Sequence, residues 1–483
     1  MNIQNYFSPK TSDIEYTQED QNKISLIMRI DSYKFSHPFA YPKGIQAMTS
    51  YGEARVKGTE IIVPFGMQLL VKRYLSETIT AEDVEAAERF AIAHFGRPLF
   101  HKAGWMKVVD VYNGKLPLII RAVREGTVIH GSQPIYTVTV FDEDLYWMSA
   151  GFETMIQRGI WYPTTIATFD YITKQEIIKR YKATGANLDL VPFALHDFGG
   201  RGVSSAETAE IGGAAHLVNF MGSDTVEGIL TANYYYKSDM AGFSVYATEH
   251  SIQCSFGPTR ENAIDYLRTQ INNATPGSIF SIVIDGYDVF REAEILCTEL
   301  KQEIIDSGAK VVFRPDSGDM MEIVPALLKM QEEAFGFTLT ETGHKRINYV
   351  GLIQGDGISH TTLLELLDKV IALGYSADVI VFGSGGALLQ KVNRDTLKFA
   401  QKACSILING NWKGIAKDPI TDSGKKSKEG ILTLGRNQAT GEIETIRIDD
   451  GFPEGYDDAH ELVYYLGRLF NEITLDEVRE NAA

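Results

Sequence analysis

Short runs of apolar residues recur from residue 191 onward, and each run ends in a cluster of polar residues or glycines. Seven clusters follow these runs, and their markers are Asp197, Asp224, His250, Asp285, Asp316, Asp356 and Gly385. Successive markers lie 26 to 40 residues apart, which is the length of a strand plus a helix. The near-continuous Val and Ile runs indicate parallel strands buried on both faces. Because repeated strand–helix units close most simply into a barrel, residues 191–392 predict an α/β barrel.

The chain on either side of this region has a different pattern. Residues 27–190 mix helical and extended patterns, and the β-branched runs in 117–142 are typical of antiparallel hairpins. Residues 393–483 contain a block of lysines and two further hairpin patterns, at 431–448 and 461–473. We expect an N-terminal α+β part with a β-rich layer, and a C-terminal segment that rejoins this layer.

The composition indicates a large globular protein. The chain has 483 residues, of which 44% are apolar, so it can bury a large core. Residues 1–26 are polar and mixed in charge, and we expect them to form a mobile tail rather than a secretory signal. No apolar run approaches the roughly 18 residues that cross a bilayer.

Cysteine content and net charge limit where in the cell the protein is expected and what it is expected to bind. The three cysteines are too few and too far apart for a disulfide framework or a zinc site, so we expect reduced thiols and a cytoplasmic location. The formal net charge of -17 disfavours binding to nucleic acid, whose affinity comes mainly from basic side chains on phosphates. Any phosphate site must therefore be formed by a small group of residues and not by an extended basic surface.

The seven polar clusters are candidates for one shared site. Active sites of barrels lie at the carboxyl ends of the strands, so the clusters would converge on one pocket. The alternative for any one cluster is that its Asp or Gly only caps the helix that follows. Seven clusters together, including Arg314 and His250, favour the shared site.

Two glycine clusters, Gly355-Asp-Gly357 and Gly383-Ser-Gly-Gly386, follow the last two predicted strands. Backbone N–H groups between a strand and an amphipathic helix can bind a phosphate monoester. Glycines in such a turn can equally have a steric purpose, and this spacing is not that of dinucleotide-binding folds. Adjacent glycine loops after the last strands are the commonest phosphate site of a barrel.

Arg314 and Asp316 lie two residues apart, and Pro315 fixes the backbone between them. They can pair with each other, or Arg314 can bind a pyrophosphate oxygen while Asp316 accepts hydrogen bonds from ribose hydroxyls. We favour the second interpretation. His250 can be a structural residue, but its place among the other clusters favours binding or accepting a phosphoryl group.

Nine motifs occur in one order along the chain. They are Asp31-Ser-Tyr-Lys34, Ala194-Leu-His-Asp-Phe-Gly199, Arg201-Gly-Val-Ser-Ser205, Gly222-Ser-Asp-Thr225, Glu249-His250, Arg314-Pro-Asp-Ser-Gly318, Gln354-Gly-Asp-Gly357, Phe382-Gly-Ser-Gly-Gly386 and Lys417-Asp-Pro419. Together they resemble the nicotinamide phosphoribosyltransferase family of the nicotinate/nicotinamide phosphoribosyltransferase superfamily, from about residue 27 to the end. The resemblance implies an α/β fold, with an irregular (β/α) barrel of the type II phosphoribosyltransferase kind and a flanking β-rich α+β domain.

The reaction that the resemblance implies is that of a pentosyltransferase in NAD salvage. Nicotinamide and 5-phosphoribosyl 1-pyrophosphate would give nicotinamide mononucleotide and pyrophosphate. Mg²⁺ and the co-substrate ATP are implied as well, together with a homodimer that shares its active sites. In this family ATP can phosphorylate the active-site histidine, here His250, and so drive the synthesis.

The resemblance also implies a role for individual residues. The catalytic residues would be His250, Arg314 and Asp316. The residues that bind nicotinamide would be Phe198, Asp224, Arg314 and, contributed by the second subunit, Tyr33. The pyrophosphate would lie on Arg201, His250 and Arg314, the ribose on Asp316, and the 5-phosphate on Gly355, Asp356, Gly385, Gly386 and Arg394. The β- and γ-phosphates of ATP would lie near Arg55, Lys402, Lys417 and Lys425.

Glu249 and Asp285 are the candidate ligands of Mg²⁺, directly or through water. Pyrophosphate leaves with negative charge, so positive charge is needed beside it, and Mg²⁺ prefers oxygen ligands. Either carboxylate could equally support a neighbouring residue or cap a helix.

Asp224 separates nicotinamide from nicotinate, the base of the nearest alternative reaction. An ionised aspartate accepts a hydrogen bond from an amide but repels a carboxylate, so nicotinamide is favoured and nicotinate phosphoribosyltransferase is the alternative. A non-catalytic nucleotide-binding homologue and a different phosphate-binding barrel enzyme are further alternatives. Gly200 and Ala400 depart from the family pattern, but neither removes a group named in the reaction.

Overall fold

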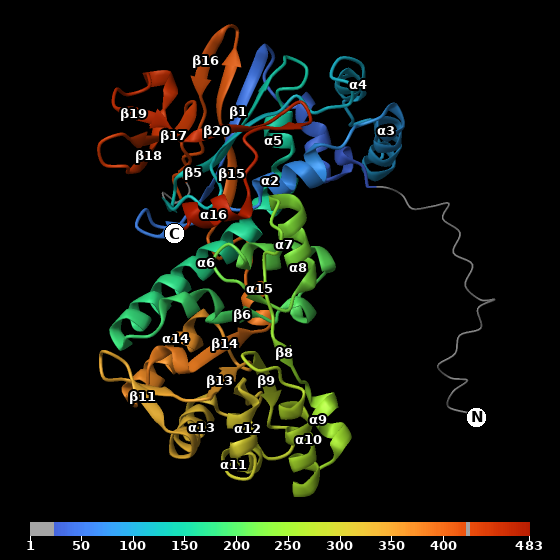
Figure 1. Ribbon diagram of the computed structural model, residues 1–483. Helices are drawn as coiled ribbons and strands as arrows, with labels where there is room; N and C mark the ends of the chain where they lie inside the picture. The colour runs from blue at the N-terminus through green and yellow to red at the C-terminus, as the bar shows by residue number, and fades with distance from the viewer. Residues whose placement is uncertain (1–23, 422–425) are drawn as a thin grey trace, which may run out of the picture.

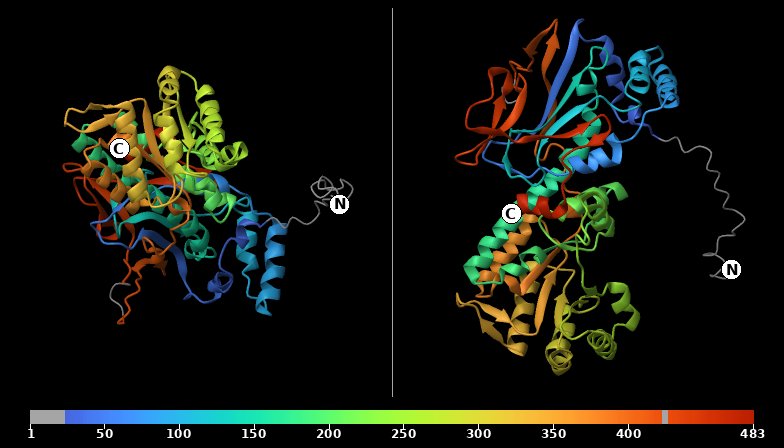
Figure 2. Two further views of the ribbon diagram at one scale, coloured as in Figure 1. Left: turned by 90° about the horizontal axis from the view of Figure 1, so that it is seen from below. Right: turned by 45° about the horizontal axis from the view of Figure 1, so that its top comes forward.

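The computed structural model describes residues 24–421 and 426–483, which form two layers joined by one long helix (Figure 1). A β-rich layer lies at one end of the molecule and a ring of parallel strands surrounded by helices at the other, as the right view of Figure 2 also shows. Most of the segment expected to be a mobile tail, up to residue 23, lies outside the described residues. Within the described ranges no helix is both long enough and apolar enough to cross a membrane.

The β-rich layer is built on a seven-stranded antiparallel sheet with the strand order β16-β15-β1-β5-β3-β20-β21. Its strands are β1 (Ile45–Ala54), β3 (Ile119–Val123), β5 (Pro134–Phe141), β15 (Phe399–Ile408), β16 (Asn411–Gly414), β20 (His460–Tyr465) and β21 (Arg468–Leu469). The strand β15 pairs with β1, and β20 pairs with β3. C-terminal strands therefore lie beside N-terminal strands in one sheet.

Smaller elements complete this layer. The hairpin of β17 (Leu432–Asn437) and β18 (Ile443–Arg447) forms where the sequence predicts one, but it makes a separate three-stranded sheet with β19 (Tyr456–Asp458). The short strands β2 (Ile61–Ile62) and β4 (Ile129–His130) pair with each other. The helices of this layer are α2 (Met67–Leu70), α3 (Ala81–Phe95), α4 (Lys102–Asp110) and α5 (Met148–Gly151). Because α5 packs on β1, β5 and β15, that face of the sheet is buried.

One helix of 32 residues, α6 (Glu153–Thr184), connects the two layers. Near its start Glu153 pairs with Lys402 of β15, and near its end Arg180 pairs with Asp368 on the barrel side. Each layer has its own core of buried apolar side chains, and Trp161 of α6 packs against both cores. The helix therefore fixes the β-rich layer relative to the barrel.

The second layer is an irregular barrel of seven parallel strands in the order β7-β6-β14-β13-β10-β9-β8. The strands are β6 (Leu195–Asp197), β7 (Gly222–Ser223), β8 (Tyr246–Ala247), β9 (Ile279–Val283), β10 (Lys310–Arg314), β13 (Val350–Gln354) and β14 (Ile380–Ser384). Phe243, just before β8, bridges to Gly222 of β7, and its backbone N–H donates to Met221 O (2.7 Å). This contact joins the two edges of the curled sheet. The predicted fold class, a (β/α) barrel with a flanking β-rich part, is confirmed.

Helices cover the outside of the barrel. They are α7 (Ala206–His216), α8 (Val226–Tyr236), α9 (His250–Phe256), α10 (Arg260–Asn272), α11 (Val289–Cys297), α12 (Lys301–Ser307), α13 (Met320–Phe335), α14 (His360–Ala372), α15 (Gly386–Leu389) and the C-terminal α16 (Leu475–Asn481). The hairpin of β11 (Phe337–Leu339) and β12 (Lys345–Ile347) follows α13. The single turn of α15 is shorter than the amphipathic helix expected after Gly386, because the chain from Gln390 onward leads to β15 in the other layer.

Candidate active site

His250 and Asp285 meet at the carboxyl ends of two neighbouring strands. His250 is the first residue of α9, and its Nε2 lies 3.0 Å from Asp285 Oδ1. The other oxygen of Asp285 accepts hydrogen bonds from the backbone N–H of Asp316 (3.0 Å) and from the hydroxyl of Ser317. The Asp285 side chain is 3% exposed, whereas that of His250 is 45% exposed. Asp285 therefore holds the imidazole in place while the ring stays accessible.

Arg314 is the last residue of β10, and its guanidinium lies between a carboxylate and an aromatic ring. Its Nη2 donates to Asp316 Oδ2 (3.1 Å), and its Cζ lies 5.6 Å from the centre of the Phe198 ring. Its Nε is buried without a hydrogen-bond partner among the described residues. A buried N–H without an acceptor is costly, so this corner of the site suits an anionic ligand.

A cavity of about 340 Å³ extends from this corner into the barrel. Phe198, Asp224 and Arg314 line the same cavity. The Phe198 ring lies against β14 at Gly383, where a Cβ atom would be only 2.0 Å from the ring. Only glycine leaves room for the ring there. One face of a flat ligand could therefore stack on Phe198 while its edge meets Asp224.

Two side chains set the polarity around Asp224. The Ser244 hydroxyl donates to the Asp224 carboxylate, and the Asp224 backbone N–H donates to Asp197 O (2.9 Å). His196 lines the cavity as well, and burial lowers its pKa to about 4, although Asp224 opposes this shift. The His196 ring is therefore neutral at pH 7.

The capping alternative fails for the acidic residues at three strand ends. The carboxylate that caps α11 is Asp288, not Asp285, and the one that caps α13 is Asp319, not Asp316. The N-cap of α8 is Thr225, without a side-chain hydrogen bond, and Asp224 binds Ser244 instead. These three carboxylates are thus free of a capping role.

The glycine loops lie close together at the same end of the barrel. A Cβ at Gly355 would be 2.9 Å from Asp316 Oδ1, and one at Gly202 would be 2.9 Å from the Gly386 Cα atom. The space around Gly385 is open. The loop of Gly202 also presents Arg201 to solvent, and Asp356 is exposed next to Gly355. The backbone of these loops can therefore be approached closely by a ligand.

A buried histidine–aspartate pair supports β7, the strand that ends just before Asp224. His216 of α7 lies between Asp170 of α6, with Nδ1 2.7 Å from Oδ2, and the backbone oxygen of Gly222, 3.1 Å from Nε2. Burial alone would lower the pKa of His216, but the Asp170 carboxylate raises it above its ordinary value. A protonated ring satisfies both acceptors, and it fixes the position of Gly222 two residues before Asp224.

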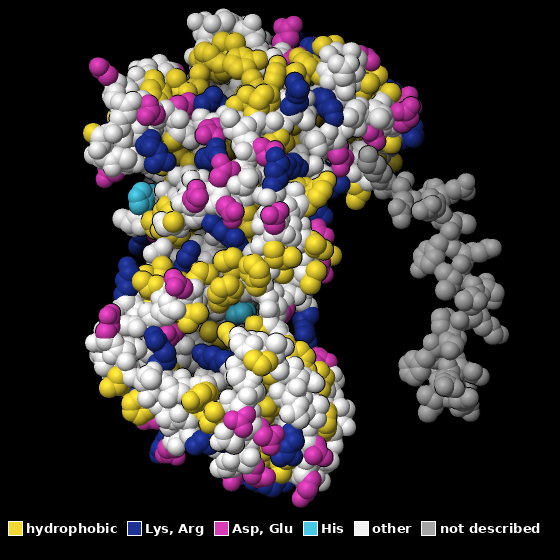
Figure 3. Space-filling view, in the orientation of Figure 1, with side chains coloured by type: hydrophobic (Ala, Val, Ile, Leu, Met, Phe, Trp, Pro, Cys, Tyr) yellow, Lys and Arg dark blue, Asp and Glu magenta, His cyan; other side chains and the backbone are white. Residues whose placement is uncertain are grey.

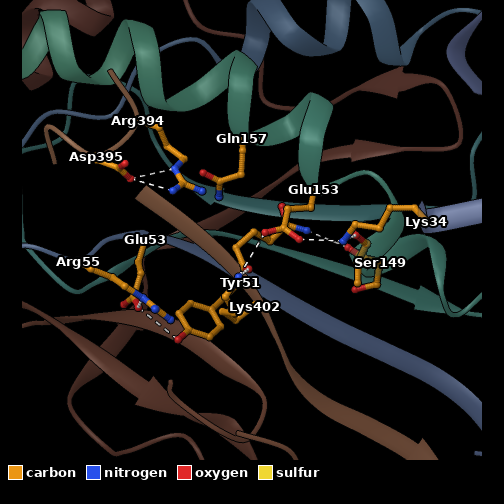
Figure 4. A network of polar contacts seen from close by, with 12 residues as sticks. Lys34, Tyr51, Glu53, Arg55, Ser149, Glu153, Gln157, Arg394, Asp395 and Lys402 are labelled. Atoms are coloured by element: carbon orange, nitrogen blue, oxygen red, sulfur yellow. Dashed lines mark hydrogen bonds and ion pairs between the residues drawn. The ribbon is translucent and has the colours of Figure 1, made fainter. Parts of the chain in front are cut away.

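Arg55 and Lys402, two of the predicted ATP-binding residues, lie in the β-rich layer next to carboxylates (Figure 4). Glu153 accepts from Lys34 Nζ (2.9 Å) and from Lys402 Nζ (3.3 Å). Glu53 accepts from Arg55 Nε (3.1 Å) and pairs with Lys428. We call these six residues the β-layer charge network.

Four further predicted residues are Arg394, Tyr33, Lys417 and Lys425. Arg394 pairs with its neighbour Asp395 (2.8 Å), near the start of α6 (Figure 4). Tyr33 is 53% exposed in the β-rich layer. Lys417 is exposed, and Lys425 lies outside the described residues. Within the described part of the chain, no hydrogen bond or ion pair connects Arg55, Lys402 or Arg394 to the barrel-end residues.

Comparison with known proteins decides the family. A model of the nicotinate phosphoribosyltransferase (NAPRTase) family matches residues 193–460, and a model of the nicotinamide phosphoribosyltransferase N-terminal domain matches residues 25–120. Nicotinamide phosphoribosyltransferase from Xanthomonas campestris pv. campestris is 42% identical, over 95% of this chain and 98% of that protein. The enzyme of the same name from Acinetobacter baylyi is 32% identical, over 95% and 97%. The chain belongs to the nicotinamide phosphoribosyltransferase family. It is a pentosyltransferase.

Solved structures of low sequence identity share the fold of this family member. The superposition on nicotinate-nucleotide pyrophosphorylase from Pyrococcus furiosus covers 97% of this chain and 97% of that one, with a TM-score of 0.61 at 15% identity. Human nicotinic acid phosphoribosyltransferase covers 94% of this chain and 92% of its own, with a TM-score of 0.55 at 14% identity. The barrel with its flanking β-rich layer is thus the type II phosphoribosyltransferase fold.

The carboxylates suit a magnesium ion that arrives with phosphate oxygens. Within the described residues no group of three or more His, Cys, Asp or Glu side chains could hold a metal ion. Both oxygens of Asp285 are already occupied, and Glu249 accepts from Ser251. Mg²⁺ commonly takes one or two carboxylates plus substrate phosphates and water. Asp285 and Glu249 could therefore supply one or two oxygen ligands to an ion that brings further oxygen ligands with it, but the described residues form no complete site.

Several residues that contact the candidate site residues of this family member could not be predicted from the sequence. They are Ser244 beside Asp224, the pair of Asp170 and His216, and the acids Glu53 and Glu153 of the β-layer charge network. Each of them meets a partner that is distant in sequence or lies in an unremarkable stretch. Lys428 is the one residue that the lysine-rich block could have indicated.

Proposed function

We propose that the chain is a nicotinamide phosphoribosyltransferase, which converts nicotinamide and 5-phosphoribosyl 1-pyrophosphate to nicotinamide mononucleotide and pyrophosphate. The observation that carries this proposal is the cavity in which Phe198, Asp224 and Arg314 lie together. The ring of the base stacks on Phe198, and its carboxamide N–H donates to Asp224. The names of the homologous enzymes support the same reaction.

The choice of amide over carboxylate rests on Asp224. Its carboxylate accepts a hydrogen bond from the amide and repels the negative charge of nicotinate, which costs several kcal/mol where water is excluded. His196 does not offset this repulsion, because its low pKa leaves it neutral at pH 7. Nicotinate is therefore the poorer substrate.

The donor binds across the barrel end. The pyrophosphate lies on Arg201, His250 and Arg314, and the buried Nε of Arg314 is a donor with no acceptor among the described residues. The backbone N–H of Asp316 donates to Asp285, which holds Asp316 in place. The Asp316 carboxylate accepts hydrogen bonds from the ribose hydroxyls. The 5-phosphate binds the backbone N–H groups of the glycine loops, with Arg394 as counter-ion. The N–H groups proposed to bind the 5-phosphate are those of Gly355, Asp356, Gly385 and Gly386.

Transfer requires that the C1–pyrophosphate bond of the donor breaks as the pyridine nitrogen attacks C1. Negative charge develops on the leaving group, where the guanidinium of Arg314 stabilises it, while Asp316 lies on the side of the cationic ribose. Asp285 and Glu249 would hold Mg²⁺, directly or through water, and the ion would supply positive charge beside the leaving pyrophosphate. Phe198 holds the base in line.

ATP coupling is part of the proposal. His250 takes the γ-phosphoryl group of ATP on a ring nitrogen, ADP leaves, and later hydrolysis of the phosphohistidine drives the synthesis. Asp285 supports this role, because its carboxylate lies 3.0 Å from His250 Nε2 and orients the imidazole. Arg55, Lys402, Lys417 and Lys425 would bind the phosphates of ATP.

A homodimer completes each site. Among the residues that the structure describes, no hydrogen bond, ion pair or aromatic contact joins Tyr33 or the cations of the β-layer charge network to the barrel-end residues. Val226, Leu230 and Tyr234, at 59%, 59% and 78% exposure, line one face of α8. Figure 3 shows apolar side chains gathered where the two layers meet. A second copy that covers this face would bring its Tyr33 to the base.

The direct test is product analysis after incubation with phosphoribosyl pyrophosphate, Mg²⁺ and either base, with and without ATP. We expect nicotinamide mononucleotide as the main product, at a yield that ATP increases. A product formed only from nicotinate would contradict the choice of base. No product from either base would contradict the enzymatic proposal, and an ATP-independent yield would contradict the coupling.

A further inference from the structure

The helix α9, which begins with His250, is tied to the neighbouring α11 by a buried side chain. Gln253 follows His250 by less than one helical turn, and its side chain is 2% exposed. Its Nε2 donates to Glu292 Oε2 of α11, and its Oε1 accepts from the backbone N–H of Gly286 (2.9 Å). Both polar atoms of the amide are thus satisfied in one orientation only.

Gly286 is adjacent to Asp285, the residue that holds His250. A Cβ atom at position 286 would be 2.4 Å from the Gln253 Oε1 atom, so the amide fits there only because residue 286 is glycine. The backbone position of Asp285 and that of α9 are therefore set by the same side chain.

The first turn of α11 is built for this contact. Glu292 is 1% exposed, and Arg291 Nη2 lies 3.6 Å from its Oε1. Arg291 Nη1 also donates to Pro258 O (3.1 Å), just after α9. Burying a carboxylate and an amide together is costly unless the geometry is kept, so the pair restricts α9 to one position.

We propose that Gln253 and Glu292 are positioning residues that keep the imidazole of His250 on Asp285. They touch neither base nor donor. This inference rests on the proposed function of His250 as the acceptor of the γ-phosphoryl group. Loss of the pair lets α9 shift, which slows phosphorylation of His250 but leaves the cavity around Phe198 unchanged.

A set of matched variants tests the pair. Gln253→Met keeps the length of the side chain and removes both hydrogen bonds. Gln253→Glu places two carboxylates together, and the double variant Gln253→Glu with Glu292→Gln restores one carboxylate and one amide in exchanged positions. Gln331→Ala is the control, because Gln331 is a buried glutamine of α13 that donates to Gly351 O (2.9 Å) and lies outside this contact.

The full-length protein is labelled with γ-³²P-ATP, the acid-labile label on His250 is followed in time, and nicotinamide binding is measured by calorimetry. We expect Gln253→Met and Gln253→Glu to be labelled about tenfold more slowly or worse, with the Kd for nicotinamide within about twofold of the unmodified protein. The exchanged double variant should recover most of the rate of His250 labelling. The Gln331→Ala variant should be labelled at the rate of the unmodified protein, even if the Tm of this variant is lower.

The outcomes separate this inference from the proposed function. If the unmodified protein is not labelled on His250, the proposed coupling fails. If it is labelled and a folded Gln253→Met protein is labelled at the same rate, the positioning role is wrong. Equal losses in Gln253→Met and Gln331→Ala, or no recovery in the exchanged variant, would also overturn it.

Discussion

The barrel end and the β-layer charge network differ in how their charges are balanced. At the barrel end, Arg314 keeps a buried Nε that has no acceptor within residues 24–421 and 426–483, and Asp224 faces an open cavity. In the network, Glu53 and Glu153 each neutralise two cations of the same chain. The first region is thus organised for a ligand before it binds, whereas phosphates that reach the second must compete with carboxylates. Base and donor binding should therefore depend on single barrel-end residues more strongly than ATP binding depends on single lysines.

The largest effect is expected at Asp316. Asp316→Asn removes the charge beside Arg314 and weakens binding of the ribose hydroxyls, so kcat/KM for phosphoribosyl pyrophosphate should fall about a hundredfold or more. Asp319→Asn is the matched control, because Asp319 only caps α13 and asparagine is an equally good N-cap. Steady-state kinetics of both variants check this. Equal losses in the two would show that Asp316 does not touch the donor.

A smaller effect is expected at Asp224. Asp224→Asn removes the repulsion of nicotinate and keeps a hydrogen-bonding side chain beside Ser244. The ratio of kcat/KM for nicotinamide to that for nicotinate should fall by about tenfold or more. Competition between the two bases for one enzyme sample measures this ratio. An unchanged ratio would mean that another residue selects the base.

Single cations of the β-layer charge network should matter less. Lys402→Ala should raise the KM for ATP by about tenfold or less and leave the KM for nicotinamide unchanged, because the Lys402 side chain bonds to Glu153 of α6 and to Gln401 O of its own strand. Lys413→Ala changes an exposed lysine on the neighbouring strand β16 and serves as control. A rise in the nicotinamide KM of the Lys402 variant would break the division between the two regions.

The smallest effect concerns stability. Burial raises the pKa of Glu292 to about 7, so folding favours its protonated form. This contribution to stability is complete below the ordinary pKa near 4.5 and is lost as the pH rises through about 7. Glu292→Gln carries no charge, so its Tm relative to the unmodified protein should rise between pH 5 and pH 8, by about 2 °C. A difference that is constant with pH would show that Glu292 is not buried as a titrating group.

The sequence predicts the barrel end well because strand ends leave a local pattern. The apolar runs before Asp197, Asp285 and Asp316 mark buried strands, and the polar residues after them lie together because parallel strands end at one edge. Gly383 and Gly386 belong to the same pattern. Gly383 packs against the Phe198 ring, and Gly386 packs against Gly202. Only the structure reveals these two neighbours.

Other features leave no such pattern. The closure of the barrel by Phe243, the bridging role of α6 and the pair of Asp170 with His216 depend on contacts between residues far apart in sequence. Their side chains look like ordinary core or surface residues when they are read one at a time. The contact of Gln253 with Glu292 belongs to the same class, since neither residue is part of a motif. Long-range pairing of this kind has to be read from the fold.

The central claim is that the barrel end recognises nicotinamide through Asp224, and one measurement tests it most directly. The unmodified protein is assayed with saturating phosphoribosyl pyrophosphate, Mg²⁺ and ATP, and kcat/KM is determined for nicotinamide and for nicotinate. We predict that nicotinamide is preferred by about a hundredfold or more, as expected when a carboxylate faces a desolvated carboxylate. A preference for nicotinate, or equal values for the two bases, would contradict the claim.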